Sequence, residues 1–167
     1  MRGKPVSASS VILSRVMHPN DASFMGTVHG GVILRMLDEA GGMAAFRHAR
    51  KPVVTAAIDS MSFLAPVYVG NLVTAKASVN SVGMTSMEVG VRVEAEDLSS
   101  GKLTHTASGY LVYVAVGRRG GKPLRVPPLV PVTDEDRRRM AAAESRRKAR
   151  AARRMAGQKG RRCSQTA

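Results

Sequence analysis

Apolar residues between Gly30 and His48 recur at the three- and four-residue spacing of an α-helix. The residues of this repeat fall on one face, and they are Ile33, Met36, Leu37, Ala40 and Ala44. A loop rich in Asn, Asp, Ser, Pro and Gly precedes the segment at residues 18–27, and Pro52 closes it. The pattern therefore predicts one long helix with a broad buried stripe.

From Pro52 to Gly117 the pattern changes to that of β-strands. The clearest alternation lies at residues 87–94, where apolar Met87, Val89, Val91 and Val93 alternate with Glu88, Gly90, Arg92 and Glu94. Further strands are predicted at residues 11–17, 53–59, 72–79 and 103–116. Short turns between consecutive long strands favour an antiparallel sheet. We expect an α+β fold: a strand, a long helix and then a four-strand meander, with about five strands wrapped around one central helix.

The last third of the chain has a different composition. Residues 123–131 are rich in proline, which predicts an extended segment packed along a surface. Thr133 and three acidic residues after it then predict a helix start. From Arg137 to about Met155 this helix is rich in Ala and Arg without an apolar stripe, so we expect it to be exposed or frayed, and the last ten residues to be disordered. The predicted division is one domain at 1–132, including the proline-rich extension, and a basic helix and tail at 133–167.

Positive charge is concentrated in that last third. The net charge is +14; residues 1–117 carry 10 Lys/Arg and 8 Asp/Glu, whereas residues 118–167 carry 16 and 4. Such a segment attracts nucleic acid, acidic membranes or polyphosphates, or it is simply a solvated tail. No aromatic residue follows Tyr113, which argues against a nucleic-acid partner because single-strand binders stack bases on aromatic rings.

The composition also limits the class of protein. A chain of 167 residues fits one domain, and it contains no run of about 18 uncharged apolar residues. Cys163 is the only cysteine, so an intrachain disulfide is excluded. His18, His29, His48 and His105 lack the spacing of metal ligands, so we expect no metal. We expect a cytoplasmic protein.

Asp38 is the first candidate for chemistry. It lies within the predicted helix on a face of small residues that it shares with Gly31, Gly41 and Gly42, so another backbone or a ligand can approach it closely. Two ordinary roles stay open: a surface carboxylate beside Glu39, or a buried carboxylate that caps a structural feature.

The glycine pairs around Asp38 also have two interpretations. Gly41 and Gly42 can permit close packing, since each helix-interior glycine costs about 1 kcal/mol relative to alanine. Gly30 and Gly31 at the helix start can in addition present free N–H groups to an anion or a polarised carbonyl oxygen.

Several segments, taken in order, resemble the hotdog-fold acyl-CoA thioesterases, above all the cytosolic acyl-CoA hydrolase branch with its two-domain brain enzyme and single-domain bacterial relatives. The likeness runs from Met17 to Asp136. The segments that carry it are His18-Pro19-Asn20-Asp21-Ala22, Val28-His29-Gly30-Gly31, Met36-Leu37-Asp38-Glu39-Ala40-Gly41, Val54-Thr55-Ala56, Phe63-Leu64-Ala65-Pro66-Val67-Tyr68-Val69-Gly70 and Thr85-Ser86-Met87-Glu88-Val89.

The resemblance implies a hotdog fold that pairs into homodimers, commonly three to a hexamer, with the active site at the dimer interface. It implies hydrolysis of acyl-CoA to a free acid and CoA, without a cofactor. Asp38 would act as general base or nucleophile, and the N–H of Gly30 or Gly31 would polarise the thioester carbonyl. His29 would line the substrate site or cap the helix.

One position departs from the family pattern. Ser23 stands where many members carry a catalytic Asn that opposes the Asp across the interface. Serine has one donor and a shorter reach than an amide, so hydrolysis can survive, slow down or shift to other acyl groups. A non-hydrolytic acyl-CoA-binding or regulatory protein is the alternative function.

The phosphates of CoA require a basic surface or free N–H groups. The turn formed by Gly83, Thr85 and Ser86 is the candidate binding segment, with Arg47 and Arg50 beyond the helix as further candidates. An ordinary hairpin and a solvated helix end are the alternative interpretations. Acyl chain length cannot be inferred from the sequence.

Overall fold

The computed structural model describes residues 1–117 and 121–163. Its strands are β1 (Lys4–Pro5), β2 (Val11–Val16), β3 (Val53–Phe63), β4 (Leu72–Val82), β5 (Ser86–Asp97), β6 (Lys102–Ala115) and β7 (Leu129–Val130). Its helices are α1 (Gly30–Ala49) and α2 (Asp134–Cys163), with short 3-10 turns η1 (Val6–Ser9) and η2 (Pro19–Asp21). No helix in these two ranges is long and apolar enough to cross a membrane.

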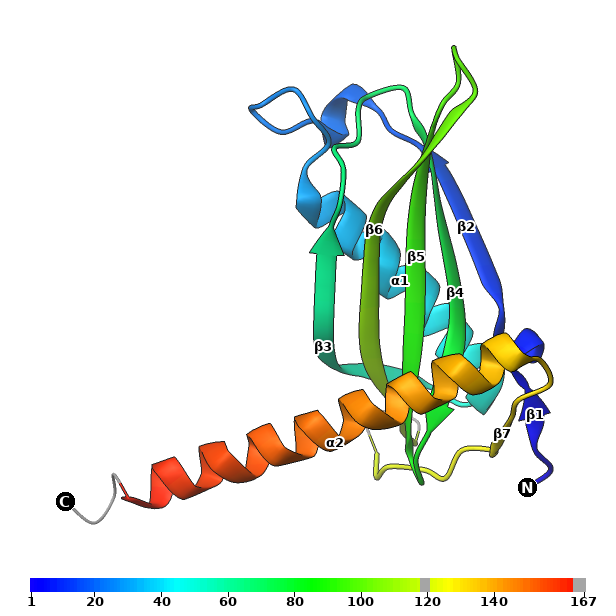
Figure 1. The fold of residues 1–167 in the computed structure, drawn as a ribbon, viewed down its shortest axis with the longest axis vertical. Helices are drawn as coiled ribbons and strands as arrows, with labels where there is room; N and C mark the ends of the chain where they lie inside the picture. The colour runs from blue at the N-terminus through cyan, green and yellow to red at the C-terminus, as the bar shows by residue number, and fades with distance from the viewer. Residues whose placement is uncertain (118–120, 164–167) are drawn as a thin grey trace.

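Five strands form one antiparallel sheet in the order β2-β4-β5-β6-β3. Helix α1 packs on one face of this sheet and α2 crosses the other face near one end of the strands (Figure 1). The α+β class and the five-strand sheet around a long helix are therefore confirmed.

The predicted periodicities are confirmed in the core. All five residues of the predicted helix stripe are buried between α1 and the sheet. The alternating apolar residues of β4 and β5 are buried against them, including Val73, Val79, Val89 and Val93, each with no exposed area. At about 25 cal/mol for each Å² of apolar surface removed from water, this layer provides most of the stabilisation of the fold.

The predicted four-strand meander is wrong in one respect. Strands β4, β5 and β6 do follow one another, but β3 pairs with β6 at the far edge and β2 pairs with β4. The segment between β3 and β4 crosses over the start of α1, where Val28 N donates to Val67 O and Leu64 N donates to Thr106 O. The pairing of β3 with β6 depends on this crossing segment, and the pattern of apolar residues does not predict the crossing.

Most residues of the basic helix are exposed, as expected, but one side of its first half packs on the sheet. Ala143 has no exposed area, and Met140 packs against the core. Arg146 and Arg150 pair with the carboxylate of Glu88, which lies beneath the helix on β5. The helix is regular as far as Cys163, beyond the predicted end near Met155. The expected disorder of the last ten residues is therefore wrong for residues 158–163, which are helical, and residues 164–167 lie outside the described residues.

The proline-rich segment is extended and packed, as predicted. Val126 and Leu129 are buried, and β7 pairs in parallel with β1. The ring of His48, at the end of α1, lies beneath this segment with Nε2 2.9 Å from Pro127 O. Its Nδ1 is buried without a hydrogen-bond partner among the described residues.

His48 makes stability depend on pH. Burial lowers the pKa of His48 below its ordinary value of 6.5, against a smaller opposing effect of the Pro127 hydrogen bond. The unfolded chain therefore binds the proton more tightly, so stability is complete above about pH 6.5 and falls by up to ~1.4 kcal/mol per pH unit below it. We expect the melting temperature to fall between pH 7 and pH 5 more steeply for the wild type than for His48→Gln. Parallel curves for the two proteins would contradict this assignment.

Candidate active site

Asp38 is held by two side chains from β3 and β6, the two neighbouring strands at one edge of the sheet. Thr55 on β3 donates from Oγ1 to Asp38 Oδ1 at 2.8 Å. The Tyr113 hydroxyl on β6 lies 3.1 Å from the same Oδ1 and 3.0 Å from the main-chain oxygen of Asp38. Asp38 itself is half-buried. Two donors on one oxygen fix the orientation of the carboxylate.

Both donors use Oδ1, and Oδ2 has no hydrogen bond to any described residue. Thr55 is exposed on β3, which is the last strand of the sheet, so the carboxylate lies at an open edge. Oδ2 is therefore the oxygen available to a water molecule or to a substrate.

Tyr113 reaches Asp38 because Gly41 has no side chain. A Cβ on Gly41 would lie 2.5 Å from the Tyr113 Oη, a distance that real contacts do not reach. Burial, followed by the charge of Asp38, raises the pKa of the Tyr113 hydroxyl above its ordinary value of 10.0. The hydroxyl therefore stays protonated and acts as a fixed donor.

A second group of predicted residues lies at the start of α1. His29 is the N-cap of the helix, and its Nδ1 accepts a hydrogen bond from Gly31 N at 2.9 Å. The Gly30 N–H has no hydrogen-bond partner among residues 1–117 and 121–163, and the Phe63 ring lies 3.3 Å from where its Cβ would be. Beside Gly30 there is a cavity of about 420 Å³ lined mainly by apolar side chains, including Ile33 and Val67.

Ser23 begins a short protruding loop that is tied to this helix start. Its main-chain N donates to Thr27 O at 2.6 Å, and its Oγ accepts from Met25 N at 3.2 Å. Phe24 at the tip is 98% exposed, and the loop extends beyond the sheet and α1 (Figure 1). Met25 beside it is 73% exposed, so the tip of the loop presents two adjacent large apolar side chains to water.

The turn that contains Gly83, Thr85 and Ser86 joins β4 to β5 at the other end of the strands. Gly83 N donates to Ser86 O at 2.7 Å, and Thr85 O accepts from Ala115 N at 2.9 Å. Ser86 pairs with Val114, next to Tyr113, so the turn lies near the Asp38 part of the molecule. Arg47, a further candidate, donates instead to Ser10 O.

The candidate residues therefore form two groups within one chain. Asp38, Thr55 and Tyr113 make the first, and Ser23, His29, Gly30 and Gly31 make the second. Asp38 is eight residues beyond Gly30 on α1, which corresponds to about 12 Å along a helix axis. A thioester carbonyl held at Gly30 therefore lies out of reach of Asp38 in the same chain.

Thr55 and Tyr113 were not predicted as site residues. Thr55 lies in one of the segments that carry the family likeness, and Tyr113 was noted only as the last aromatic. The signal for Tyr113 is indirect: Gly41, one turn after Asp38, leaves a space that a large side chain must fill. No group of three or more His, Cys, Asp or Glu residues in the described part of the chain could hold a metal ion.

The family model for the Thioesterase superfamily matches residues 25–102. The protein VdlD of Helicobacter pylori is 38% identical over 142 residues, which are 85% of this chain and 80% of that protein. The uncharacterized acyl-CoA thioester hydrolase YkhA of Bacillus subtilis is 36% identical over 77% of this chain and 74% of its own length. The cytosolic acyl coenzyme A thioester hydrolase of Rattus norvegicus is 34% identical over 84% of this chain but only 37% of its own length.

Solved structures agree with these relatives. An apo-hexameric acyl-CoA thioesterase superposes with a TM-score of 0.88 at 38% identity, over 92% of this chain and 97% of that one. An acyl-CoA hydrolase from Staphylococcus aureus, solved with butyryl coenzyme A and coenzyme A, gives a TM-score of 0.85 at 33% identity, over 94% and 95%.

Alanine variants of the Staphylococcus aureus hydrolase have also been solved. They replace an aspartate, an asparagine 15 residues before it and a threonine 17 residues after it. Asp38, Ser23 and Thr55 have these same separations in this chain. Two of the three residue types are therefore kept here, and Ser23 stands at the position of the asparagine.

Proposed function

This chain belongs to the thioesterase superfamily, and from that membership and the geometry around Asp38 we propose how it hydrolyses acyl-CoA thioesters. The observation that carries the mechanism is the Asp38 carboxylate, with Oδ1 held by Thr55 and Tyr113 and Oδ2 free at the sheet edge. Asp38 is the catalytic residue; Thr55 and Tyr113 are positioning residues that orient it.

Hydrolysis consumes one water for each acyl-CoA. In one route Oδ2 takes a proton from water while the water oxygen attacks the acyl carbon. In the other route Oδ2 attacks first and gives a mixed anhydride that water then cleaves. In both routes the carbon–sulfur bond breaks, and sulfur leaves as the CoA thiolate, which takes up the proton. No cofactor is required, because water and a carboxylate perform every step.

The second group of residues holds the thioester. The Gly30 N–H, which has no partner in the described part of the chain, lies at the positive end of the α1 dipole and is a donor for the thioester oxygen, on which negative charge develops. Such a donor is typically worth about 3 kcal/mol in the transition state. The apolar cavity beside Gly30 accepts the first carbons of the acyl chain, with Ile33 and Phe63 on its wall.

Two copies of the chain complete each site. The separation of about 12 Å between the two groups means that Asp38 of one copy acts on a thioester held at Gly30 of another. The free edge of β3 and the exposed tip of the Ser23 loop are the surfaces that the second copy covers. A hexamer built as three such dimers is the assembly we propose, in keeping with the hexameric relative.

A cytoplasmic location is also part of the proposal, supported by the cytosolic rat relative.

The serine at position 23 favours one alternative function, the binding of acyl-CoA without hydrolysis. A serine hydroxyl offers a single donor where the asparagine offers two, so the attacking water or the carbonyl loses one contact. Hydrolysis is the better supported function because the carboxylate and both of its positioning residues are present.

We expect the purified chain to release CoA from at least part of an acyl-CoA series from C2 to C16. Thiol release is measured with a colorimetric reagent, and binding is measured in parallel by calorimetry. The apolar cavity beside Gly30 accepts the acyl chain, and the rates across the series measure the chain length that it prefers. Tight binding of every acyl-CoA with no thiol release would establish the alternative instead.

A further inference from the structure

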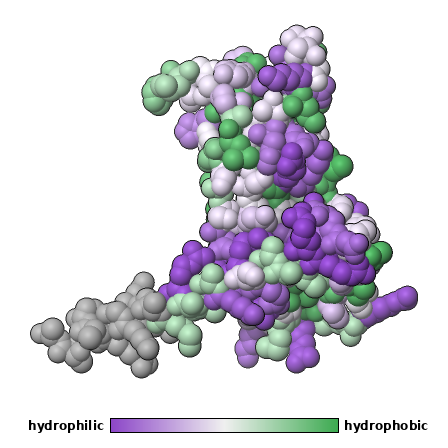
Figure 2. Space-filling model, in the orientation of Figure 1, coloured by the Kyte–Doolittle hydropathy of each residue, from purple (hydrophilic) through white to green (hydrophobic). Residues whose placement is uncertain are grey.

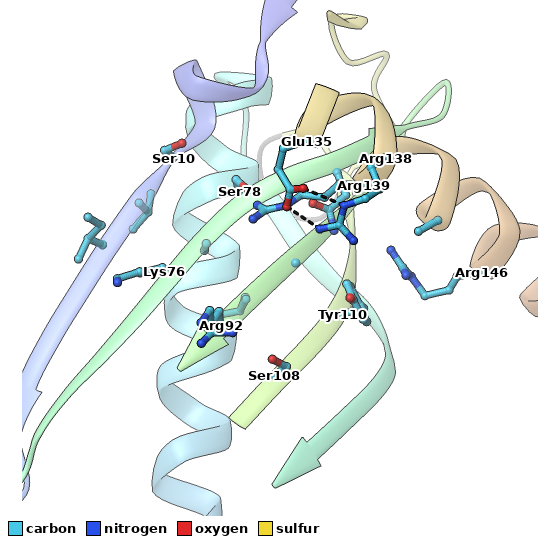
Figure 3. A pocket seen from close by; sticks show the side chains of 17 residues that line it. Ser10, Lys76, Ser78, Arg92, Ser108, Tyr110, Glu135, Arg138, Arg139 and Arg146 are labelled. Atoms are coloured by element: carbon cyan, nitrogen blue, oxygen red, sulfur yellow. Dashed lines mark hydrogen bonds and ion pairs between the residues drawn. The ribbon is translucent and has the colours of Figure 1, made fainter. Parts of the chain in front are cut away.

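A second cavity, of about 440 Å³, lies on the face of the sheet opposite α1, beneath the first turns of α2 (Figure 3). Its floor is formed by β4, β5 and β6, and its rim by α2. On β5, Arg92 lines this cavity, whereas the next residue, Val93, is fully buried in the core on the α1 side. The cavity is therefore separated from Asp38 by the thickness of the sheet.

The floor holds two like charges side by side. Lys76 and Arg92 are directly paired across β4 and β5, an arrangement that destabilises a sheet unless the charges are compensated. One carboxylate serves both: Glu94 accepts from Lys76 Nζ at 2.6 Å and from Arg92 Nε at 2.7 Å. These hydrogen bonds lower the pKa of Glu94, so it remains ionised and the trio carries one net positive charge.

The rim repeats this pattern of two cations on one carboxylate. Arg138 and Arg139 both bind Glu135, at 2.7 Å each. Arg146 extends over the Tyr110 ring, 3.6 Å from its centroid, and shares Glu88 with Arg150. Hydrophilic side chains gather over the face where α2 crosses the sheet (Figure 2). Positive charge is thus in excess on both sides of the cavity.

An amide side chain in the floor is accessible from the cavity. Asn80 is 4% exposed and lines the cavity, yet its side chain makes no hydrogen bond to any residue that the structure describes. It lies over Gly90, where a Cβ would be 2.5 Å from Asn80 Nδ2. Among the described residues only His48 Nδ1 is a buried side-chain polar atom without a partner, so the Asn80 amide is accessible from the cavity, where a ligand can replace water on it.

We propose that this cavity binds a small anion that carries two or more phosphate groups. The paired arginines supply charge-assisted hydrogen bonds to phosphate oxygens, and Asn80 supplies a neutral donor. The volume is in the range of small-molecule sites. The proposal does not depend on hydrolysis.

Inorganic pyrophosphate is the probe, titrated into the full chain by calorimetry at low and at physiological salt. We expect saturable binding that weakens with salt, since ionic screening acts on these half-exposed arginines. Arg92→Gln and Arg139→Gln should each weaken binding by about tenfold, and Asn80→Ala by a few fold.

Arg137→Gln is the matched control. Arg137 precedes Arg139 on α2 by two residues and is also paired with an acid, Asp134, but it does not line the cavity. Its affinity for pyrophosphate should stay within about twofold of the wild type. Equal losses in Arg137→Gln and Arg139→Gln, or no binding at 1 mM pyrophosphate (roughly −4 kcal/mol), would overturn the proposal.

CoA then identifies the source of the phosphates. Displacement of pyrophosphate by CoA, lost in Arg92→Gln, would assign the cavity to the phosphates of the substrate. Pyrophosphate binding that is unaffected by saturating CoA would assign it to a separate phosphorylated effector. Each result supports a phosphate site, and Asp38→Asn should leave pyrophosphate affinity unchanged in either case.

Discussion

An Asp38→Asn chain should bind acyl-CoA with nearly wild-type affinity and release CoA about 10³-fold more slowly. The amide oxygen of asparagine can still accept from Thr55 and Tyr113, so the side chain keeps its place. The NH₂ group replaces Oδ2, the oxygen that acts on water, and it is neither a base nor a nucleophile. Steady-state CoA release together with calorimetric binding of CoA measures the two properties separately.

Glu39→Gln is the control for this substitution. Glu39 is the next residue on α1, and its carboxylate is exposed and paired with Arg35 at 2.8 Å. Its removal changes the same charge in the same helix but touches no part of the site, so the rate should stay within about twofold of the wild type. Hydrolysis by Asp38→Asn at the wild-type rate would show that another group activates the water.

Gly41→Ala should lower both stability and activity, whereas Gly42→Ala should raise stability. A methyl group on Gly41 would lie 2.5 Å from Tyr113 Oη and would displace the ring, and overpacking of this kind costs about 1–3 kcal/mol. The displaced hydroxyl also leaves Asp38, and a lost hydrogen bond of ~1.4 kcal/mol corresponds to about tenfold in rate. A methyl group on Gly42 meets only an ordinary contact, 3.7 Å from the Tyr113 ring, and alanine gains up to about 1 kcal/mol in helix propensity.

Two measurements, thermal unfolding and CoA release, are made on the two glycine variants and on Tyr113→Phe. They separate the effect of overpacking on stability from the effect of the Tyr113 hydroxyl on the position of Asp38. Tyr113→Phe keeps the ring and should lose rate without the overpacking penalty of Gly41→Ala. Equal losses of stability in Gly41→Ala and Gly42→Ala would contradict the role of Tyr113, and would mean that both glycines pack against another copy.

Local patterns predicted the elements of this fold but not their contacts. The helix stripe from Ile33 to Ala44 and the alternation at residues 87–94 depend only on neighbours in sequence, and both are confirmed. The place of β3 beside β6 depends on a crossing over the helix start, and burial of Ala143 depends on the outer face of the sheet. Strand β6 is far from β3 in sequence, and the sheet residues that bury Ala143 are far from α2, so neither contact could be predicted from residue spacing.

In the site, too, the residue marked by a local pattern was predicted, and the residue that depends on a distant contact was not. Asp38 was identified because a lone carboxylate stood on a face of small residues within an apolar helix. Tyr113, 75 residues away, was missed because only the fold brings its hydroxyl to Asp38. The roles of Ser23, His29, Gly30, Gly31, Gly83, Thr85 and Ser86 stay predictions, although the structure adds that His29 caps the helix and leaves the Gly30 N–H as the free donor.

Co-expression of Asp38→Asn with Gly30→Val tests most directly whether Asp38 of one copy acts on a thioester held at Gly30 of another. Each variant alone should be nearly inactive. Every Asp38→Asn site lacks the carboxylate, and in every Gly30→Val site the valine side chain blocks the thioester carbonyl from the N–H of residue 30. In the mixed assembly a site takes Asp38 from one chain and Gly30 from another, so about a quarter of the sites should be intact and about a quarter of wild-type CoA release should return. CoA release that stays at the level of the separate variants would contradict the composite site, as would a wild-type rate from Gly30→Val alone.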